Sequence, residues 1–116
     1  MIFGAHVIVY SNDAAADRAF FQEVFGLSSV DAGNGWLIFA LPPSELAIHP
    51  AAEDVRNELY FMCADLKAEM RSLEAKGVHF TEVEEARWGS LTRIRLPGGG
   101  EVGLYQPNHP SPLIPA

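Results

Sequence analysis

The sequence has few of the features that mark secreted and membrane proteins. It contains one cysteine, Cys63, which excludes an internal disulfide and is typical of a reducing compartment. It has no apolar run long enough to cross a bilayer, and its first residues lack the charged flank and apolar core of a signal peptide. We therefore expect a cytoplasmic protein without a membrane partner.

Basic residues are also few. The chain has 8 Lys and Arg against 15 Asp and Glu, which gives a formal net charge of −7. Such a surface repels phosphate backbones, so we expect no nucleic-acid partner, whereas a cationic small molecule would be attracted. Solubility alone also explains the acidic balance.

Common catalytic signatures are missing as well. There is no P-loop and no G-x-S-x-G nucleophile elbow. Gly98, Gly100 and Gly103 have the spacing of a dinucleotide-binding motif, but a predicted strand follows them instead of a helix, so no dinucleotide site is implied. What remains is a chain of 116 residues, 48% hydrophobic, which is enough for one domain with its own core.

A repeated segment organises the chain. The segment from His6 to Asp13 returns in altered form as the segment from Glu58 to Asp65, and 58 − 6 and 65 − 13 both equal 52. In each copy a residue that can bind a metal begins a strand-like run, an acidic residue ends it, and a helical pattern follows. A period of this size indicates one supersecondary unit used twice.

The local patterns predict the same order of elements in both halves. Alternating apolar residues, helix caps and the Asn34-Gly35 hairpin signal predict, in the first half, a strand over 3–11, a helix over 13–25, and strands over 28–31, 36–41 and 45–49. The second half is predicted to hold a strand over 59–63, a helix over 65–76, and strands over 78–83, 91–96 and 101–106. A proline-rich tail, 108–116, is expected to be extended.

These repeated pieces resemble the vicinal oxygen chelate (VOC) superfamily, which includes glyoxalase I, bleomycin- and fosfomycin-resistance proteins and extradiol dioxygenases. The resemblance is carried by the two strand copies, the helix end Phe25-Gly26-Leu27 and the closing run from Leu96 to Pro107. It implies an α+β fold of two βαβββ modules that form a cup-shaped mixed sheet. The expected single domain is 1–107, with module 1 at about 3–50 and module 2 at about 57–107. A homodimer and a divalent metal in the cup are also typical of the family.

The metal positions implied by the resemblance fall on His6, Ala47, Glu58 and Gly103. Because a catalytic metal normally has at least three protein ligands, His6 and Glu58 alone are too few. His49 and Glu101 share a strand face with Ala47 and Gly103 and could replace the missing ligands, although residues two apart on a strand are separated by about 6.6 Å. We therefore favour a degenerate metal site.

His6 and Glu58 are also the candidate catalytic groups. A lone histidine acts as a ligand or general base, or else is a hydrogen-bonded pocket residue. A buried Glu58 needs a cation, a metal or a proton. Arg93 and Arg95 are predicted to face the cup, where they either hold a carboxylate-bearing ligand or neutralise acidic residues in a structural network, which we favour.

The cup is predicted to be largely aromatic and apolar. This lining suits a flat or cationic ligand, although core packing explains it equally well. Cys63 is expected to face the helix as a core residue. The predicted lining residues are Trp36, Ile38, Tyr60, Met62 and Tyr105.

Three functions are consistent with these patterns. The leading hypothesis is a metal-independent small-molecule binding protein with the ligand in the cup. The second is a metal-dependent lyase, isomerase or dioxygenase using His6, Glu58 and one of His49 or Glu101. The third is an interaction module whose cup is filled by its own side chains. Whether the protein is an enzyme is left open by the sequence.

Overall fold

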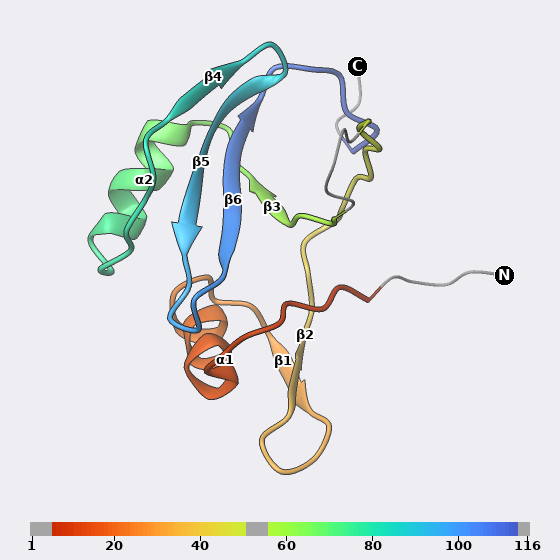
Figure 1. The fold of residues 1–116 in the computed structure, drawn as a ribbon, viewed down its shortest axis with the longest axis vertical. Helices are drawn as coiled ribbons and strands as arrows, with labels where there is room; N and C mark the ends of the chain where they lie inside the picture. Colours follow the sequence, from red (N-terminus) through yellow and green to blue (C-terminus); the bar gives the residue numbers. More distant parts are fainter. Residues whose placement is uncertain (1–5, 51–55, 114–116) are drawn as a thin grey trace, which may run out of the picture.

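A four-stranded mixed sheet is the largest element of the computed structural model, which describes residues 6–50 and 56–113 (Figure 1). The strand order is β3-β6-β5-β4, with β3 at Tyr60–Met62, β4 at Glu84–Ala86, β5 at Gly89–Arg95 and β6 at Glu101–Pro107. β3 runs parallel to β6, and the other neighbours are antiparallel. With helix α2 (Leu66–Glu74) between β3 and β4, the second half has the predicted βαβββ order.

The two helices begin and end in the same way. Helix α1 (Ala14–Glu23) is capped by Asp13, whose carboxylate accepts the Ala16 N–H at 3.1 Å, and α2 is capped by Asp65, which accepts the Ala68 N–H at 3.1 Å. Both helices are followed by a glycine with positive φ, +67° at Gly26 and +86° at Gly77. The repeat predicted from the sequence is therefore confirmed at the level of helix caps.

A two-stranded hairpin follows α1. Strands β1 (Ser29–Asp31) and β2 (Leu37–Phe39) pair antiparallel, as the Asn-Gly signal predicts. Asn34 and Gly35 take positive φ values of 54° and 81°, and the Asp31 carboxylate accepts the Gly33 N–H at 2.7 Å. The turn residues thus fix the register of the hairpin.

Helix α1, the hairpin and the sheet meet in one apolar core. Phenylalanine side chains join the three parts, with ring centroids 4.8 Å apart for Phe25 and Phe61 and 6.0 Å apart for Phe21 and Phe39. α2 packs on the same face of the sheet. The buried members of this core are Phe21, Leu66, Leu73, Val78, Ile94, Leu96, Val102 and Leu104.

A buried carboxylate also ties α1 to the sheet. Asp17 Oδ1 accepts the Gly98 N–H at 2.7 Å, and the Asn12 N–H donates to the Gly98 carbonyl at 3.0 Å. The second oxygen, Oδ2, is buried and has no hydrogen-bond partner among the described residues. Since the acceptor is shielded from water, loss of this hydrogen bond would leave the Gly98 N–H without a partner.

The first half differs from its prediction. Residues 6–11 and 45–49 were expected to be strands, but neither segment is a strand in the structure, and residues 3–5 lie outside the described part. Each segment is held at one end, by the bond from Asn12 to Gly98 and by the bonds of the Glu45 carboxylate to Tyr105 and Ser111. A strand needs a neighbour for its N–H and C=O groups, and these contacts do not supply one.

A smaller difference concerns the strand predicted over 78–83. The structure has an isolated bridge there, between Phe80 and Ile94, and the regular strand β4 begins at Glu84. Arg93 O accepts the Thr81 N–H at 3.0 Å, so the segment still runs beside β5. No helix in the described part of the chain is long and apolar enough to cross a membrane.

Replacing Asp17 should separate the contribution of this bond from that of helix α1. We expect Asp17→Ala to lower the free energy of unfolding by about 2 kcal/mol, because it leaves the Gly98 N–H without its acceptor. Asp17→Asn keeps an acceptor oxygen for the Gly98 N–H and puts an amide NH2 in the place of the unpaired oxygen, so we expect a smaller loss than in Asp17→Ala. Urea unfolding followed by circular dichroism measures both. Glu23→Ala, at an exposed position of the same helix, is the matched control, and equal losses in Asp17→Ala and Glu23→Ala would contradict the assignment.

Candidate functional site

The face of the sheet opposite α2 carries most of the chemistry. Side chains of directly paired residues lie on one face, and the pairs here are Tyr60 with Gly103, Arg93 with Gly103, and Leu91 with Tyr105. Their neighbours Ile94, Val102 and Leu104 point the other way, into the core under α2. The alternation read from the sequence therefore assigns the two faces as the structure has them.

Three aromatic rings gather on this helix-free face. The ring centroids of Tyr60, Trp88 and Tyr105 are 5.3 to 6.1 Å apart, and each pair meets edge to face, with interplanar angles of 77° to 90°. This geometry places the positive edge of one ring against the negative face of the next, which stabilises the cluster. We call these three residues the aromatic cluster.

The cluster depends on a missing side chain. A Cβ atom at Gly103 would overlap the Tyr60 ring, so Tyr60 lies directly over the backbone of β6. Gly103 is one of the two positions where the sequence has no donor at an implied metal position. The Tyr60 ring occupies the space that a metal-binding side chain at position 103 would need.

An ion pair lies beside the cluster. Arg93 Nη1 is 3.0 Å from Glu58 Oε2, and the Arg93 guanidinium is 5.5 Å from the centroid of the Tyr60 ring. Arg56 Nη2 is 3.8 Å from the other oxygen of Glu58. About a third of each side chain of the Arg93 and Glu58 pair remains exposed, 32% and 36%, so the pair is accessible to a ligand.

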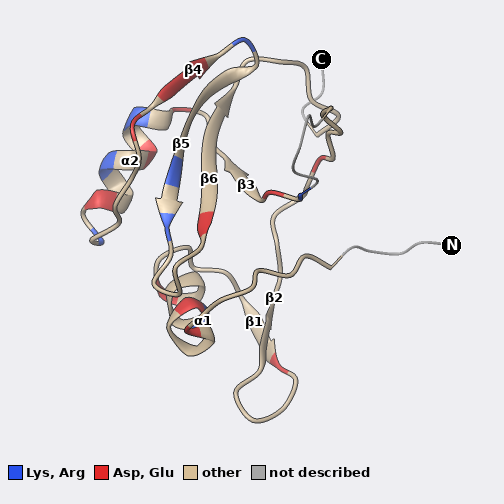
Figure 2. Ribbon diagram, in the orientation of Figure 1, with Lys and Arg blue, Asp and Glu red and all other residues tan. Residues whose placement is uncertain are grey.

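Positive charge prevails locally although the chain is acidic. Arg95 is paired in register with Glu101, one step along the same face from Arg93. This end of the cluster thus has three positive charges, on Arg56, Arg93 and Arg95, and two negative charges, on Glu58 and Glu101. Figure 2 shows the two arginines of β5 as two blue bands, whereas β4 is largely red. This part of the face favours an anionic group.

A second polar group closes the other end of the cluster. The Tyr105 hydroxyl donates to Glu45 Oε1 at 2.7 Å, and the Ser111 hydroxyl donates to Glu45 Oε2 at 2.6 Å. The bonds from Ser111 and Tyr105 lower the pKa of Glu45. Burial, followed by the bond to Glu45 and its charge, raises the pKa of Tyr105, so Tyr105 is a neutral donor. His109 lies nearby, with Nε2 3.4 Å from the Tyr105 hydroxyl oxygen.

The remaining predicted lining residues are divided between two places. Met62 lies on β3 with Tyr60 and is half-buried. Trp36 lies on the hairpin, 63% exposed, with the Arg18 guanidinium 4.7 Å from its ring centroid. Ile38 is also on the hairpin, where it helps to line an open hollow of about 270 Å³ with Ser28, Ser29, Val30, Phe39 and Ala40. Two serines are the polar side chains of this hollow, so we place the chemistry on the aromatic face instead.

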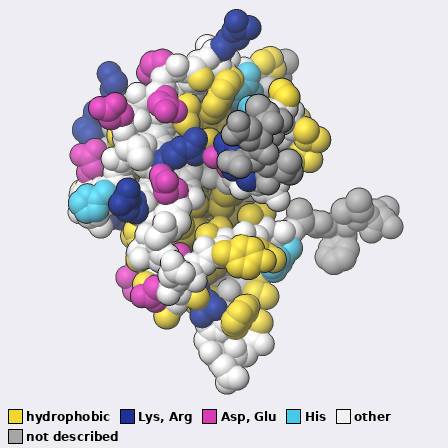
Figure 3. Space-filling model, viewed as in Figure 1, with side chains coloured by type: hydrophobic (Ala, Val, Ile, Leu, Met, Phe, Trp, Pro, Cys, Tyr) yellow, Lys and Arg dark blue, Asp and Glu magenta, His cyan; other side chains and the backbone are white. Residues whose placement is uncertain are grey.

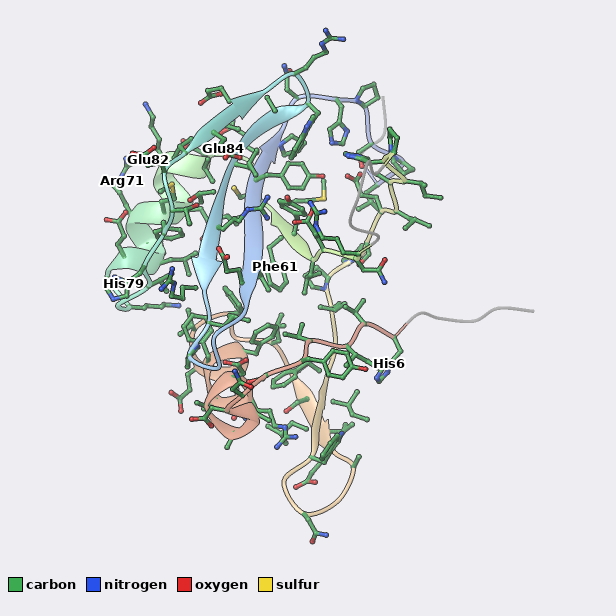
Figure 4. The ribbon with its side chains drawn as sticks, in the orientation of Figure 1. His6, Phe61, Arg71, His79, Glu82 and Glu84 are labelled. Atoms are coloured by element: carbon green, nitrogen blue, oxygen red, sulfur yellow. The ribbon has the colours of Figure 1, made fainter. Side chains whose placement is uncertain are left out.

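The residues implied for a metal do not fit one. Within the described ranges, no three His, Cys, Asp or Glu side chains come together as a metal-binding group. His6 is exposed on the segment before α1 and points outward (Figure 4), while Glu58 is paired with Arg93. His49 and Glu101 are exposed, and the position of Gly103 is covered by Tyr60. A site with three ligands and an open position is therefore not formed by this donor set.

Cys63 is not part of the site. It is packed against the core, and burial raises the pKa of its thiol to about 11. A thiol with that pKa is protonated at neutral pH and a poor nucleophile. The prediction that Cys63 is a core residue is confirmed.

Sequence reasoning missed part of this site. Glu45, His109 and Ser111 were assigned to a strand and a tail, and the direction of Trp88 could not be read from its neighbours. No local pattern links Glu45 to Tyr105, since 60 residues separate them. The Arg93 and Glu58 pair was weighed as one of two alternatives, and the structure brings those two together.

Solved structures with the same arrangement come from several bacteria. A lactoylglutathione lyase from Agrobacterium tumefaciens superposes with a TM-score of 0.59 at 20% identity, over 84% of this chain and 88% of that one. TnmS3, an antibiotic binding protein from Streptomyces sp. CB03234, superposes with a TM-score of 0.61 at 20% identity. The match covers 90% of this chain and 100% of that one. The fosfomycin resistance protein FosX from Listeria monocytogenes superposes with a TM-score of 0.58 at 17% identity, over 91% of this chain and 94% of that one.

Sequence comparison adds nothing to these likenesses. No protein-family model matches the chain, and no curated protein does either. Structural likeness at such low identity establishes the fold and leaves the ligand and activity to be argued from the residues.

The contact between Tyr60 and Gly103 can be tested by a double-mutant cycle. We expect Gly103→Ala to lower the free energy of unfolding by about 2 kcal/mol, because the new methyl group overlaps the Tyr60 ring. In a Tyr60→Ala background the same change should cost much less, since the ring is gone. Thermal or urea unfolding of the four proteins measures the coupling. Additive effects would show that Tyr60 does not occupy the space above Gly103.

Proposed function

We propose that this chain, which has the α+β fold of the VOC superfamily predicted from its sequence, is a small-molecule binding protein that works without a metal. The ligand would lie on the helix-free face, against the aromatic cluster. The observation that carries the proposal is the Tyr60 ring over Gly103, because it replaces a possible metal ligand with an aromatic surface. The antibiotic-binding and fosfomycin-resistance proteins that share the fold are consistent with a role of this kind.

The chemistry of the face favours a planar, acidic molecule. Aromatic rings bind flat apolar surfaces, and Arg93 offers a planar guanidinium beside Tyr60. A ligand carboxylate can share Arg93 with Glu58, because the pair is partly exposed and Arg56 also neutralises Glu58. Of the two roles weighed for the arginines, carboxylate recognition is therefore the one we now propose.

We also propose that the ligand-binding form is a homodimer in which a second copy covers apolar surface of the first half. Figure 3 shows hydrophobic side chains gathered between the four-stranded sheet and the hairpin. Leu46 and Ile48 are 87% and 88% exposed, and large apolar side chains at 7–10 are exposed as well. Exposed surfaces of this kind are rare in monomers.

Unpaired segments of the first half support a second copy as the partner. In the second half the strand at 60–62 pairs with β6, while the corresponding segments of the first half lie unpaired. Each copy thus presents two strand-like segments that can pair with those of another copy.

The domain boundaries remain part of this proposal. We expect one domain over 1–107 with modules at about 3–50 and 57–107, followed by the tail. Core contacts between Phe21 of the first half and Phe61 of the second support a single unit.

The ligand proposal is tested with 2-naphthoate, a planar carboxylate, in buffer containing EDTA. The chain has two tryptophans, and Trp36→Phe leaves Trp88 as the source of tryptophan fluorescence. The fluorescence of this variant therefore reports on the aromatic cluster. For a ligand of this size we expect a Kd on the order of 0.1 mM. Tyr60→Ala and Arg93→Gln should each weaken binding about 10-fold through lost stacking or charge pairing.

Two controls make the result specific. 2-Naphthamide lacks the charge and should bind Arg93→Gln and the parent protein equally. Arg71→Gln removes a guanidinium from α2, on the other face of the sheet (Figure 4), and should leave binding unchanged. Absence of saturable binding, or binding that Tyr60→Ala and Arg93→Gln leave intact, would reject the proposal and favour a face filled by the protein itself.

The dimer is tested by sedimentation equilibrium. We expect a mass near twice 12.7 kDa for the original chain. Ile8→Lys and Ile48→Lys should shift the protein toward the monomer, because each places a charge on the exposed apolar surface. Val83→Lys, at an exposed apolar residue next to β4, is the control and should remain dimeric. A monomer mass for the original chain at its highest soluble concentration would overturn this part of the proposal.

A further inference from the structure

The described part of the tail, 108–113, crosses the aromatic cluster. The Asn108 N–H donates to the Trp88 carbonyl at 2.7 Å, which holds the start of the tail beside the cluster. The next residue, His109, places its ring 6.0 Å from the Tyr105 centroid at an angle of 28°. The tail therefore belongs to the site, although nothing in its sequence indicates a binding role.

His109 contacts Tyr105 differently from the other rings. Tyr60 and Trp88 meet Tyr105 edge to face, at 90° and 77°, whereas His109 lies nearly parallel to it. With its Nε2 3.4 Å from the Tyr105 hydroxyl oxygen, the offset His109 ring lies at the hydroxyl end of Tyr105, where it obstructs the approach of a planar ligand. Tyr105 is 7% exposed, with Tyr60, Trp88 and His109 around its ring.

Polar contacts hold His109 in this position. Ser111 donates to Glu45 at 2.6 Å and accepts the Leu113 N–H at 3.1 Å, while His109 Nδ1 is 2.7 Å from the Pro110 carbonyl oxygen. Pro110 and Pro112 restrict the backbone between these contacts. We call the tail segment 109–113, held by these contacts, the latch. It is connected to Glu45 by the Ser111 hydroxyl and by His109, whose Nε2 lies 3.7 Å from Glu45 Oε1, so it can open without breaking a strand or helix.

We propose that His109 is an intramolecular ligand of Tyr105, held by the latch, and that a planar molecule binds by displacing it. This inference rests on the proposed function, because it concerns the same aromatic cluster. It goes further in making the site self-inhibited. The apparent affinity of the cluster for a ligand is then reduced by the fraction of molecules whose latch is open.

The structure also says which variants separate stacking from hydrogen bonding. His109→Ala removes the ring and should open the face of Tyr105, whereas His109→Phe keeps a planar ring and should keep the face covered. Ser111→Ala removes the bond from the tail to Glu45 but leaves the bond from Tyr105 to Glu45. His79→Ala, at an exposed position beyond α2 (Figure 4), is the matched control.

The first measurement needs no ligand. Tetranitromethane nitrates accessible tyrosines, and mass spectrometry locates the product, with added N-acetyltyrosinamide as the fully exposed reference. We expect Tyr105 to be nitrated faster in His109→Ala and Ser111→Ala than in the original chain, and at an unchanged rate in His109→Phe and His79→Ala. Equal Tyr105 rates in all five proteins would overturn the latch.

The second measurement is the affinity for 2-naphthoate. If the latch is closed in about 70–90% of molecules, its loss should tighten binding about 3- to 10-fold in His109→Ala and Ser111→Ala. Weaker binding in His109→Ala would overturn the proposal, because His109 would then be part of the binding surface. If 2-naphthoate binds no variant, the proposed function fails while the nitration rates still decide whether His109 covers Tyr105.

Discussion

The arrangement of the site depends on the close approach of one aromatic ring to a backbone without a side chain. Gly103 lets the Tyr60 ring rest on β6, and from there Tyr60 meets Tyr105, Trp88 and the Arg93 guanidinium. Any larger residue at 103 would push Tyr60 away from the sheet. The same contact makes the face apolar where a metal site would need a donor atom. The fit of Tyr60 over Gly103 therefore determines both how the rings pack and which ligands the face can bind.

The halves of the chain have unequal roles in this arrangement. The second half supplies the sheet, the aromatic cluster and the arginines, while the first half supplies α1, the hairpin and Glu45. Phenylalanine packing joins them on the far side of the sheet from the cluster, and the Asp17 carboxylate joins α1 to the turn between β5 and β6. The core and the candidate site are therefore built on opposite faces of the same strands, which lets one change without the other.

Features encoded by neighbouring residues could be predicted from the sequence, and features encoded by distant ones could not. Aspartate caps, glycine helix ends and the Asn34-Gly35 turn are local, and the structure has each of them. Strand alternation also placed Arg93 and Tyr60 on one face, because the period of a strand is two residues. The predicted strands over 6–11 and 45–49 failed because pairing is a property of two segments, and competing contacts from Gly98, Tyr105 and Ser111 are invisible in either segment alone. Glu45 and His109 joined the site by the same kind of long-range contact.

The ring over Gly103 also restricts how the chain can change over time. A carboxylate or imidazole gained at position 103 would bring a metal donor, but it would collide with Tyr60 as long as that ring is present. Loss of Tyr60 first would remove the edge-to-face contacts to Trp88 and Tyr105 before any donor had appeared. Either order passes through a less stable protein with neither kind of site intact. A metal donor at position 103 therefore requires coordinated substitution of Gly103 and Tyr60.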